Sequence, residues 1–550
     1  MRDSDKRCQQ FYQDQYAKYL QCYTPGEALN ECLHDFLDQR PSGKYSSRNR
    51  AAGLASAQFW WASETVAEAD LASLALARVL HFDDVIDIDL LSHLATHNAD
   101  QLRWAVRYSK LFTRRDSPLW VHLRKSCAGL QWQTFIDEQK SQLLWCYWMR
   151  RAIETFAASE LAGKLIGSTD NHEANQLAYI KTIRSQLYLQ VVFGLGERVR
   201  LNNGAEVTLF HAMLASELTR AFFEQAYLQP YQRYLDESGE PITALGRLAF
   251  EGLLQGENRF PMTWSEQPEK IQRIRAWTVS DDHPDGDPEA AKAILQFWTS
   301  DLQTLSEQVK QPPNLPTPRL SEKPFYKIGR YSFQFPWVAG RQNSLSAAVN
   351  NLRRVEQRRS ELRSETERIE HNLAHSLRQR GFHVVVGYEP RRVDAQDAGE
   401  IDLLACLAGV ILLLEVKSGF IRSTQQEVWL HRTNTLRKAA RQLRRKSVAV
   451  RQALQHDLGL RAALGLAAPD PLPTLHGWVV DTSIEFDGEV VDGFRIVSRE
   501  VIELALRDEL HYLKALDKQG ANEVATLYPE GFSASAFARI IEQSEVWKEL

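Results

Sequence analysis

The chain has 550 residues, about three to four times the usual length of a domain, and therefore predicts two or more folding units. Apolar residues make up 44% and charged residues 25%, which excludes disordered, collagen-like and coiled-coil proteins. With 66 Lys and Arg against 70 Asp and Glu, the net charge is −4, so any site that attracts nucleic acid or anionic lipid must be local.

Neither export nor membrane insertion is predicted. The first residues lead into Gln- and Tyr-rich sequence without the apolar segment of a secretory signal. The longest apolar run, residues 403–414, has 12 residues, whereas a membrane-spanning helix needs about 18 to 20. The six cysteines lack CxxC spacing, which disfavours a structural zinc site or a disulfide framework. We expect a cytoplasmic protein without membrane contacts.

Residues 1–310 predict an all-helical domain, because apolar residues recur there at helical spacing, as in Phe210, Met213, Leu214 and Leu218. We expect this domain to recognise a target or a protein partner. The partner could also supply ATPase activity, since the chain has no GxxxxGK[ST] motif. Five prolines in residues 311–324 then predict an extended linker. Residues 325–345 alternate aromatic and polar side chains, like a short β-hairpin.

The second half predicts an α/β domain over residues 346–505, followed by a helical tail over residues 506–550. Helical sequence up to residue 380 gives way to runs rich in Val, Ile and Leu, in the order helix, three strands, helix, two strands. The fold class is therefore multidomain, with an all-α N-terminal region and a C-terminal α/β domain whose central mixed sheet is flanked by helices.

The segments GEID (399–402) and EVKSG (415–419) contain the candidate chemistry. If Ala408 and Gly409 form a two-residue turn, Asp402 and Glu415 face each other across an antiparallel pair, on the same side of the sheet. Two carboxylates that close repel each other unless a cation lies between them, and Mg²⁺ prefers such oxygen ligands. Lys417 shares this face, where it could contact a metal-bound water. A longer loop with an odd change of register would separate the two carboxylates.

Two helices contribute further polar residues. Glu370 begins the otherwise apolar stripe Leu373, Ala374 and Leu377, and can point toward the same region. On the later helix, Lys438 and Gln442 lie one turn apart at the border of the inner face, where Gln442 could hold a phosphate or a water.

This order of Glu370 on a helix ending at Gly381, then GEID, EVKSG and a helix carrying KAARQL, resembles the PD-(D/E)XK nuclease superfamily, particularly its NERD-like and Holliday-junction-resolvase-like members. The resemblance covers about residues 365–455 and implies a restriction-endonuclease-like fold. It implies that Asp402 and Glu415 bind Mg²⁺ or Mn²⁺, that Lys417 assists the attacking water, and that Glu370 and Gln442 support them. Ile401 stands where the motif's name has proline.

A local positive charge favours a polyanionic substrate. Residues 351–462 contain 21 Lys and Arg against 13 Asp and Glu, a net charge of +8. One predicted helix carries the basic residues expected to bind phosphates, namely Lys438, Arg441, Arg444, Arg445 and Lys446. The alternative is an ordinary solvated helix face, which we prefer for residues 353–368, where Glu residues are interleaved with Arg.

These features predict a Mg²⁺- or Mn²⁺-dependent nuclease that hydrolyses DNA phosphodiester bonds, in a role such as bacterial anti-phage defence or DNA repair. One alternative is a catalytically inactive nucleic-acid-binding or scaffold protein on the same fold, against which the intact Asp402, Glu415 and Lys417 argue. The other alternative is an RNase, since no residue in the sequence distinguishes DNA from RNA.

Overall fold

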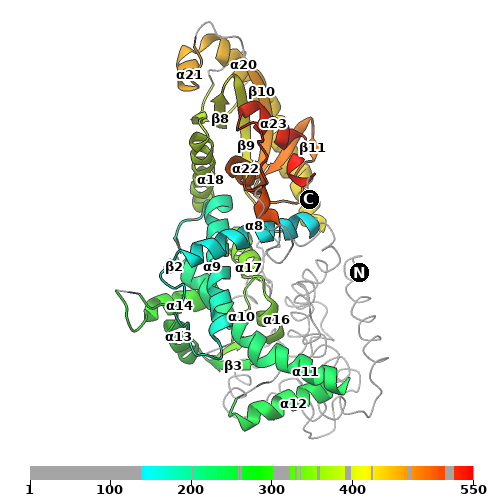
Figure 1. The fold of residues 1–550 in the computed structure, drawn as a ribbon. Helices are drawn as coiled ribbons and strands as arrows, with labels where there is room; N and C mark the ends of the chain where they lie inside the picture. The colour runs from blue at the N-terminus through cyan, green and yellow to red at the C-terminus, as the bar shows by residue number, and fades with distance from the viewer. Residues whose placement is uncertain are drawn as a thin grey trace, which may run out of the picture. The chain divides into compact units, whose positions relative to one another are not determined.

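The computed structural model describes residues 138–548, apart from 201–203, 205, 240, 258, 260–262, 281, 302–321, 329–330, 335, 356–358, 391–397, 423–424, 468–472 and 515–524 (Figure 1). The chain divides into two compact units. The "sheet unit" comprises the described residues of 134–164, 183–196 and 357–550, and the "helical unit" those of 165–182 and 197–356. Helix α9 (His172–Phe193) begins in the helical unit and ends in the sheet unit.

The sheet unit contains a six-stranded sheet and the helices that cover it. Its strands are β7 (His383–Tyr388), β8 (Ile401–Leu407), β9 (Val410–Lys417), β10 (Thr474–Asp481), β11 (Val490–Val491) and β12 (Phe494–Ser498). Its helices are α8 (Glu138–Ala157), α18 (Arg359–Gln379), α19 (Gln425–Leu430), the π-helix η4 (His431–Leu436), α20 (Arg437–His456), α21 (Leu458–Ala463), α22 (Arg499–Arg507), η5 (Leu510–Leu513), α23 (Ala534–Glu542) and η6 (Glu545–Trp547).

The sheet is mixed, with the strand order β11-β12-β10-β9-β8-β7. Strands β7, β8 and β9 form an antiparallel meander, whereas β10 is parallel to both β9 and β12. These pairings confirm the predicted α/β domain with a central mixed sheet and flanking helices. They also confirm the predicted hairpin register, because Leu407 pairs with Val410 across a turn in which Ala408 and Gly409 have φ of 48° and 78°.

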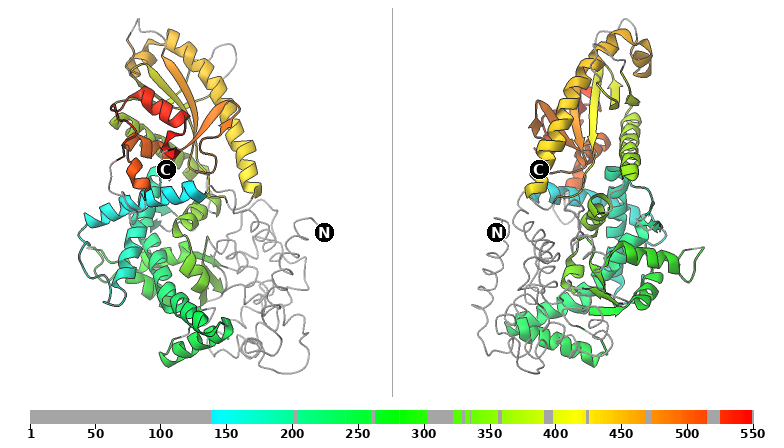
Figure 2. Two further views of the ribbon diagram at one scale, coloured as in Figure 1. Left: turned by 45° about the vertical axis from the view of Figure 1, so that its right-hand side comes forward. Right: turned by 180° about the vertical axis from the view of Figure 1, so that it is seen from behind.

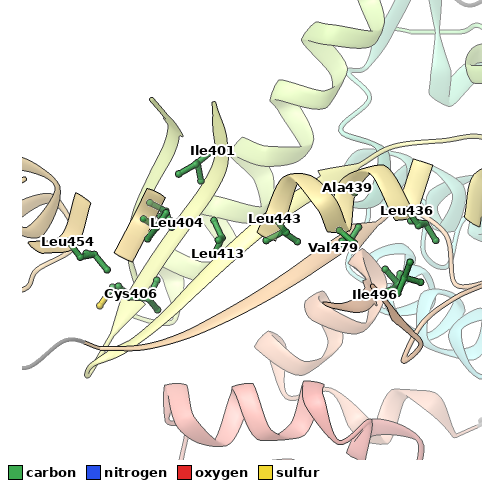
Figure 3. Packing of buried hydrophobic residues seen from close by; sticks show 14 of the residues in the cluster. Ile401, Leu404, Cys406, Leu413, Leu436, Ala439, Leu443, Leu454, Val479 and Ile496 are labelled. Atoms are coloured by element: carbon green, nitrogen blue, oxygen red, sulfur yellow. The ribbon is translucent and has the colours of Figure 1, made fainter. Parts of the chain in front are cut away.

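One face of the sheet packs against α20. Apolar residues repeat along this helix at helical spacing, and its buried apolar side chains are Ala439, Ala440, Leu443, Val450 and Leu454. They contact strand residues such as Leu404, Leu413 and Val479 in one apolar cluster (Figure 3). The amphipathic pattern of α20 therefore determines which of its side chains point toward the sheet.

The other face packs against α18 and α23 (Figure 2). The predicted stripe of α18 is buried at Leu373, Ala374 and Leu377. The helix is followed by Gly381 at φ 89°, whose N–H donates to the carbonyl of Arg378, a common way to satisfy the last carbonyls of a helix. From α23, Phe537 makes an edge-on contact with Trp478 of β10 at 5.8 Å between ring centroids. Both faces of the central strands are thus covered.

The helical unit contains β-strands as well as helices, which differs from the all-helical prediction. Its elements are β1 (Arg198–Arg200), β2 (Glu206–Thr208), α10 (Leu209–Phe223), the π-helix η2 (Glu224–Leu228), α11 (Gln229–Ser238), α12 (Pro241–Leu254), β3 (Thr263–Glu266), α13 (Gln267–Arg275), α14 (Pro288–Phe297), β4 (Thr299–Asp301), β5 (Phe325–Ile328), β6 (Tyr331–Gln334), α16 (Pro336–Arg341), α17 (Ser344–Asn350) and the π-helix η3 (Asn351–Val355). Its four-stranded sheet has the order β3-β6-β5-β4.

The expectation of an all-helical region up to residue 310 needs correction where the structure describes it. Strands β1 to β4 lie within that region, and β3 and β4 pair with β6 and β5 from beyond it. Strands of three or four residues are too short to show a clear alternation, which explains why the sequence pattern missed them. Residues 1–137 and nearly all of the predicted linker at 311–324 lie outside the described residues.

Two other expectations can be compared with the structure. Strands β5 and β6 are an antiparallel pair within residues 325–345, where the sequence predicts a hairpin. The solvated helix face expected at residues 353–368 is wrong at its start, because Arg354 is buried in an ion pair with Glu322. No helix among the described residues is both long and apolar enough to cross a membrane.

Candidate functional site

Asp402 and Glu415 lie on neighbouring strands of the sheet unit. Leu403 pairs with Leu414, and continuing this antiparallel register by one position places Asp402 opposite Glu415. The backbone N–H of Val416 donates to Oδ2 of Asp402 at 2.8 Å. Alternation along each strand directs both carboxylates to the face that α20 covers, the face of Leu404 and Leu413. The structure therefore brings together the two carboxylates predicted to bind metal.

Two lysines neutralise these carboxylates. The Lys417 Nζ donates to Oε1 of Glu415 at 2.7 Å. The Lys446 Nζ donates to Oδ1 of Asp402 at 2.8 Å and also to Oε2 of Glu415. Burial would lower the pKa of Lys446, but the negative charges of Asp402 and Glu415 outweigh this and raise it above the ordinary value. Lys446 therefore stays an ammonium ion.

The position of Lys446 corrects the sequence prediction. The sequence predicts that Lys446 binds phosphate, yet its side chain is only 4% exposed and contacts the two carboxylates. Helical spacing explains the difference, because position 446 falls between Leu443 and Val450 on the buried face of α20. An inward-pointing lysine at this position pairs with the carboxylates that the sheet presents to it.

The carboxylate chemistry fits a hard divalent cation. Asp402 and Glu415 converge on a single cationic group, the Lys446 ammonium, and carboxylate oxygens are also the ligands that Mg²⁺ and Mn²⁺ prefer. Within the part of the chain that the structure describes, no three His, Cys, Asp or Glu side chains form a ready-made metal site. A metal ion would thus depend on these two carboxylates and on water, as Mg²⁺ commonly does.

Glu370 of α18 lies within electrostatic reach of this pair. Burial raises its pKa, the nearby negative charges of Asp402 and Glu400 raise it further, and Lys417 and Lys446 partly oppose them, so that the pKa is about 8. Glu370 is therefore largely protonated and uncharged at neutral pH. As the sequence predicts, Glu370 lies near the carboxylate pair, but as a neutral acid.

The exposed basic residues of α20 form two stripes, since successive helical residues are rotated by about 100°. In the first stripe, Arg437 and Arg441 lie 3.9 and 3.8 Å from the Asp492 carboxylate, and Arg444 donates to the Asp492 carbonyl at 2.8 Å. Asp492 belongs to the turn between β11 and β12. These arginines, two of them predicted to bind phosphates, thus have an acidic partner inside the chain.

The second stripe contains Lys438, Gln442 and Arg445 and lies beside Lys446 on the helix surface. Lys438 and Arg445 are exposed, whereas Gln442 is half-buried one turn before Lys446. None of these three side chains makes a hydrogen bond or an ion pair with another described residue. This stripe therefore presents free donors next to the carboxylate pair.

A second polar cluster adjoins the first and was not predicted. Asp481 ends β10 and is the parallel neighbour of Lys417 on β9. Its Oδ2 lies 2.7 Å from Nε2 of His431 in the π-helix η4 and accepts a hydrogen bond from Ser483. Burial would raise the pKa of Asp481, but His431 and the positive charge of Arg422 outweigh this and hold it below its ordinary value. Of the residues in this second cluster, only Asp481 could have been found from the sequence, because it ends an apolar run as Glu415 does.

Comparisons with known proteins found no relative of this chain. The chain matches no protein-family model, and searches of curated proteins and of solved structures returned no match either.

Proposed function

We propose that the sheet unit is a Mg²⁺- or Mn²⁺-dependent nuclease domain that hydrolyses phosphodiester bonds of DNA. The observation that carries this proposal is the convergence of Asp402, Glu415 and Lys417 at the ends of two central, neighbouring strands. Two acceptor-only carboxylates can hold a divalent cation, and a lysine beside them can stabilise the charge that develops on a phosphate when water attacks it.

The order of elements supports a PD-(D/E)XK-type, restriction-endonuclease-like fold. Helix α18 is followed by the antiparallel strands β7, β8 and β9, then by α20, and then by β10, which runs parallel to β9. This succession agrees with the family resemblance of the sequence, on which the fold assignment also rests. The candidate residues lie on α18, β8, β9 and α20, which supports the proposal.

Each residue has a distinct role in the proposed reaction. Asp402 and Glu415 would hold the metal ion, which when bound polarises the phosphate and lowers the pKa of a coordinated water. Lys417 would position that water and offset the charge that develops on the phosphate. Glu370 and Gln442 would orient water or phosphate from the two flanking helices. Lys438 and Arg445 would neutralise backbone phosphates.

The wider setting belongs to the same proposal. A nuclease of this kind would act in the cytoplasm, in anti-phage defence or DNA repair, with the N-terminal region selecting the target or a protein partner. The local net charge of +8 over residues 351–462 supports a polyanionic substrate.

A second candidate function is favoured by one observation. The Lys446 ammonium contacts both carboxylates, so it could replace the metal permanently in a catalytically inactive, nucleic-acid-binding protein on the same fold. The two candidates differ in whether a divalent cation binds at all.

A cleavage assay tests both candidates. The full-length protein is incubated with labelled duplex DNA, single-stranded DNA and RNA, each with Mg²⁺, Mn²⁺ or EDTA. We expect divalent-dependent cleavage of DNA, lost in Glu415→Gln and lowered about a hundredfold or more in Lys417→Met. Glu542→Gln, on α23 across the sheet, is the matched control and should cleave like the wild type.

Each other result points to one alternative. Binding of nucleic acid without cleavage under any metal condition would support the inactive scaffold. Cleavage of RNA alone would change the substrate class. Cleavage that persists in both Glu415→Gln and Lys417→Met would contradict the assignment of this site.

A further inference from the structure

All four oxygens of the carboxylate pair already accept hydrogen bonds. Oδ1 of Asp402 and Oε2 of Glu415 bind Lys446, Oε1 of Glu415 binds Lys417, and Oδ2 of Asp402 accepts from the backbone of Val416. Each carboxylate oxygen has a second lone pair, but a metal ion bound through that lone pair would lie close to an ammonium group. A metal that uses both carboxylates therefore meets the positive charge of Lys446 directly.

The charges of the pair and the two lysines balance without a metal ion. Asp402 and Glu415 contribute two negative charges, and Lys417 and Lys446 contribute two positive charges. The Lys446 side chain is 4% exposed and that of Glu415 is 1% exposed, so solvent screens these charges weakly. Adding a divalent cation to the same oxygens would leave a buried excess of two positive charges, which is unfavourable, and the departure of one ammonium halves this excess.

Lys446 is the lysine that must leave. Lys417 contacts only Glu415, whereas Lys446 contacts both carboxylates and so lies between them. Its four-carbon side chain starts on the buried face of α20, beside the stripe that contains half-buried Gln442 and exposed Arg445. A change of rotamer toward that stripe would release the ammonium into solvent without moving the helix.

We propose that Lys446 is a tethered competitor of the divalent cation. Its ammonium group and the metal ion bind the same two carboxylates, and each excludes the other. The metal ion binds only when the Lys446 side chain swings away from Asp402 and Glu415. This inference rests on the proposed metal-dependent function and adds to it a residue that sets the affinity for metal. In the metal-free protein the tethered ammonium keeps two buried carboxylates neutralised.

The proposal is tested by metal binding in the absence of nucleic acid. Isothermal titration of the full-length protein with Mn²⁺ compares the wild type, Lys446→Met and Arg445→Met. We expect Lys446→Met to bind Mn²⁺ about tenfold more tightly, which is a difference of about 1.4 kcal/mol. Arg445→Met removes the same charge one residue away on the exposed face and should leave the affinity nearly unchanged.

Labelling of the wild-type protein provides a second readout, which does not depend on whether a variant folds. Lysine acetylation, followed site by site by peptide mass spectrometry, is run in EDTA and in Mn²⁺. We expect Lys446 to be protected in EDTA and to react several-fold faster with Mn²⁺, whereas exposed Lys438 on the same helix reacts equally in both conditions.

The outcomes separate this inference from the proposed function. Equal Mn²⁺ affinity of the wild type and Lys446→Met, together with unchanged labelling of Lys446, would overturn the competitor role and leave the metal-dependent nuclease intact. No Mn²⁺ binding by the wild type or by a folded Lys446→Met would overturn both. If Lys446→Met does not fold, the labelling of the wild type decides alone.

Discussion

Glu370, Asp402 and Glu415 are three acids in one region of the sheet unit, yet they differ in their contacts with lysine. Asp402 and Glu415 have ammonium partners at hydrogen-bond distance. For Glu370 no such partner is found among the described residues, and the same two lysines only partly offset its burial and the negative charges nearby. The pKa of Glu370 is raised because no ammonium group at hydrogen-bond distance offsets its burial.

The pKa of Glu370 predicts how stability depends on pH. Because burial and nearby carboxylates raise this pKa from 4.5 to about 8, the folded protein keeps a proton that the unfolded chain has released between these pH values. The contribution of Glu370 to stability is therefore fully present below about pH 4.5 and is lost as the pH rises through about 8. Glu370→Gln should match the wild type at low pH and be more stable at pH 9.

Urea unfolding in EDTA at several pH values measures this difference. Glu530→Gln, at an exposed position, controls for the general effect of removing one carboxylate from the protein. A constant difference between Glu370→Gln and the wild type from pH 4 to pH 9 would contradict the raised pKa.

At the scale of elements, the β8–β9 hairpin and α20 together build the site. The hairpin's two-residue turn has positive φ at both residues, which matches the twist of the flanking strands and fixes their register. Its apolar positions then anchor α20, whose buried stripe includes Leu443 and Val450. Lys446 reaches the carboxylates because it lies between these two anchors on the helix.

The two basic stripes of α20 should differ in their contact with nucleic acid. Arg445 is exposed and has no described partner, whereas Arg441 lies near the Asp492 carboxylate, which already offsets part of its charge. Arg445→Gln should therefore weaken DNA binding and flatten the slope of log K against log salt by about 0.9, the value for one lost phosphate contact. Arg441→Gln should change the slope less.

Fluorescence anisotropy titrations at several salt concentrations provide the measurement. Catalytically inactive Glu415→Gln can serve as the common background, so that cleavage does not obscure binding. Equal slopes for the two arginine variants would show that the stripes do not differ, and unchanged slopes for both would place the nucleic acid on another surface.

At the scale of the molecule, the sheet unit is not a single continuous stretch of sequence. Helix α8 belongs to this unit, although its sequence lies about two hundred residues before that of α18. The Trp148 Nε1 donates to Oε1 of Glu500 at 2.6 Å, and the Tyr147 hydroxyl donates to Oε2 of Glu509 at 2.8 Å. The predicted domain of residues 346–505 therefore lacks a helix that completes the unit.

The role of α8 can be tested with two tryptophans of the same helix. Trp148 is 3% exposed, so Trp148→Ala should leave a cavity, remove one hydrogen-bond donor from Glu500 and cost about 3 to 5 kcal/mol of unfolding free energy. Trp145 is 48% exposed, and Trp145→Ala should cost about 1 kcal/mol or less.

Urea unfolding followed by far-ultraviolet circular dichroism measures both variants. Trp148→Phe separates packing from hydrogen bonding, because it keeps an aromatic ring and removes the donor to Glu500. Equal stability of Trp148→Ala and Trp145→Ala would show that α8 is dispensable for the sheet unit.

Short-range features of this protein could be predicted from the sequence. The apolar stripe of α18, the register of β8 with β9 and the proximity of Asp402, Glu415 and Lys417 all involve residues that are near neighbours along the chain. Helical spacing, strand alternation and a two-residue turn are local rules, because each depends on the backbone geometry of a few residues. The α/β character of the second half followed from the same rules.

Only the tertiary structure decided the long-range features. The parallel pairing of β9 with β10 makes Asp481 the neighbour of Lys417, and no local pattern connects positions so far apart. The packing of α20 on the sheet turned Lys446 inward, and the packing of α8 placed Trp148 against Glu500. These contacts depend on which apolar surfaces bury each other, and burial is non-directional, so the linear order of residues does not specify its partners.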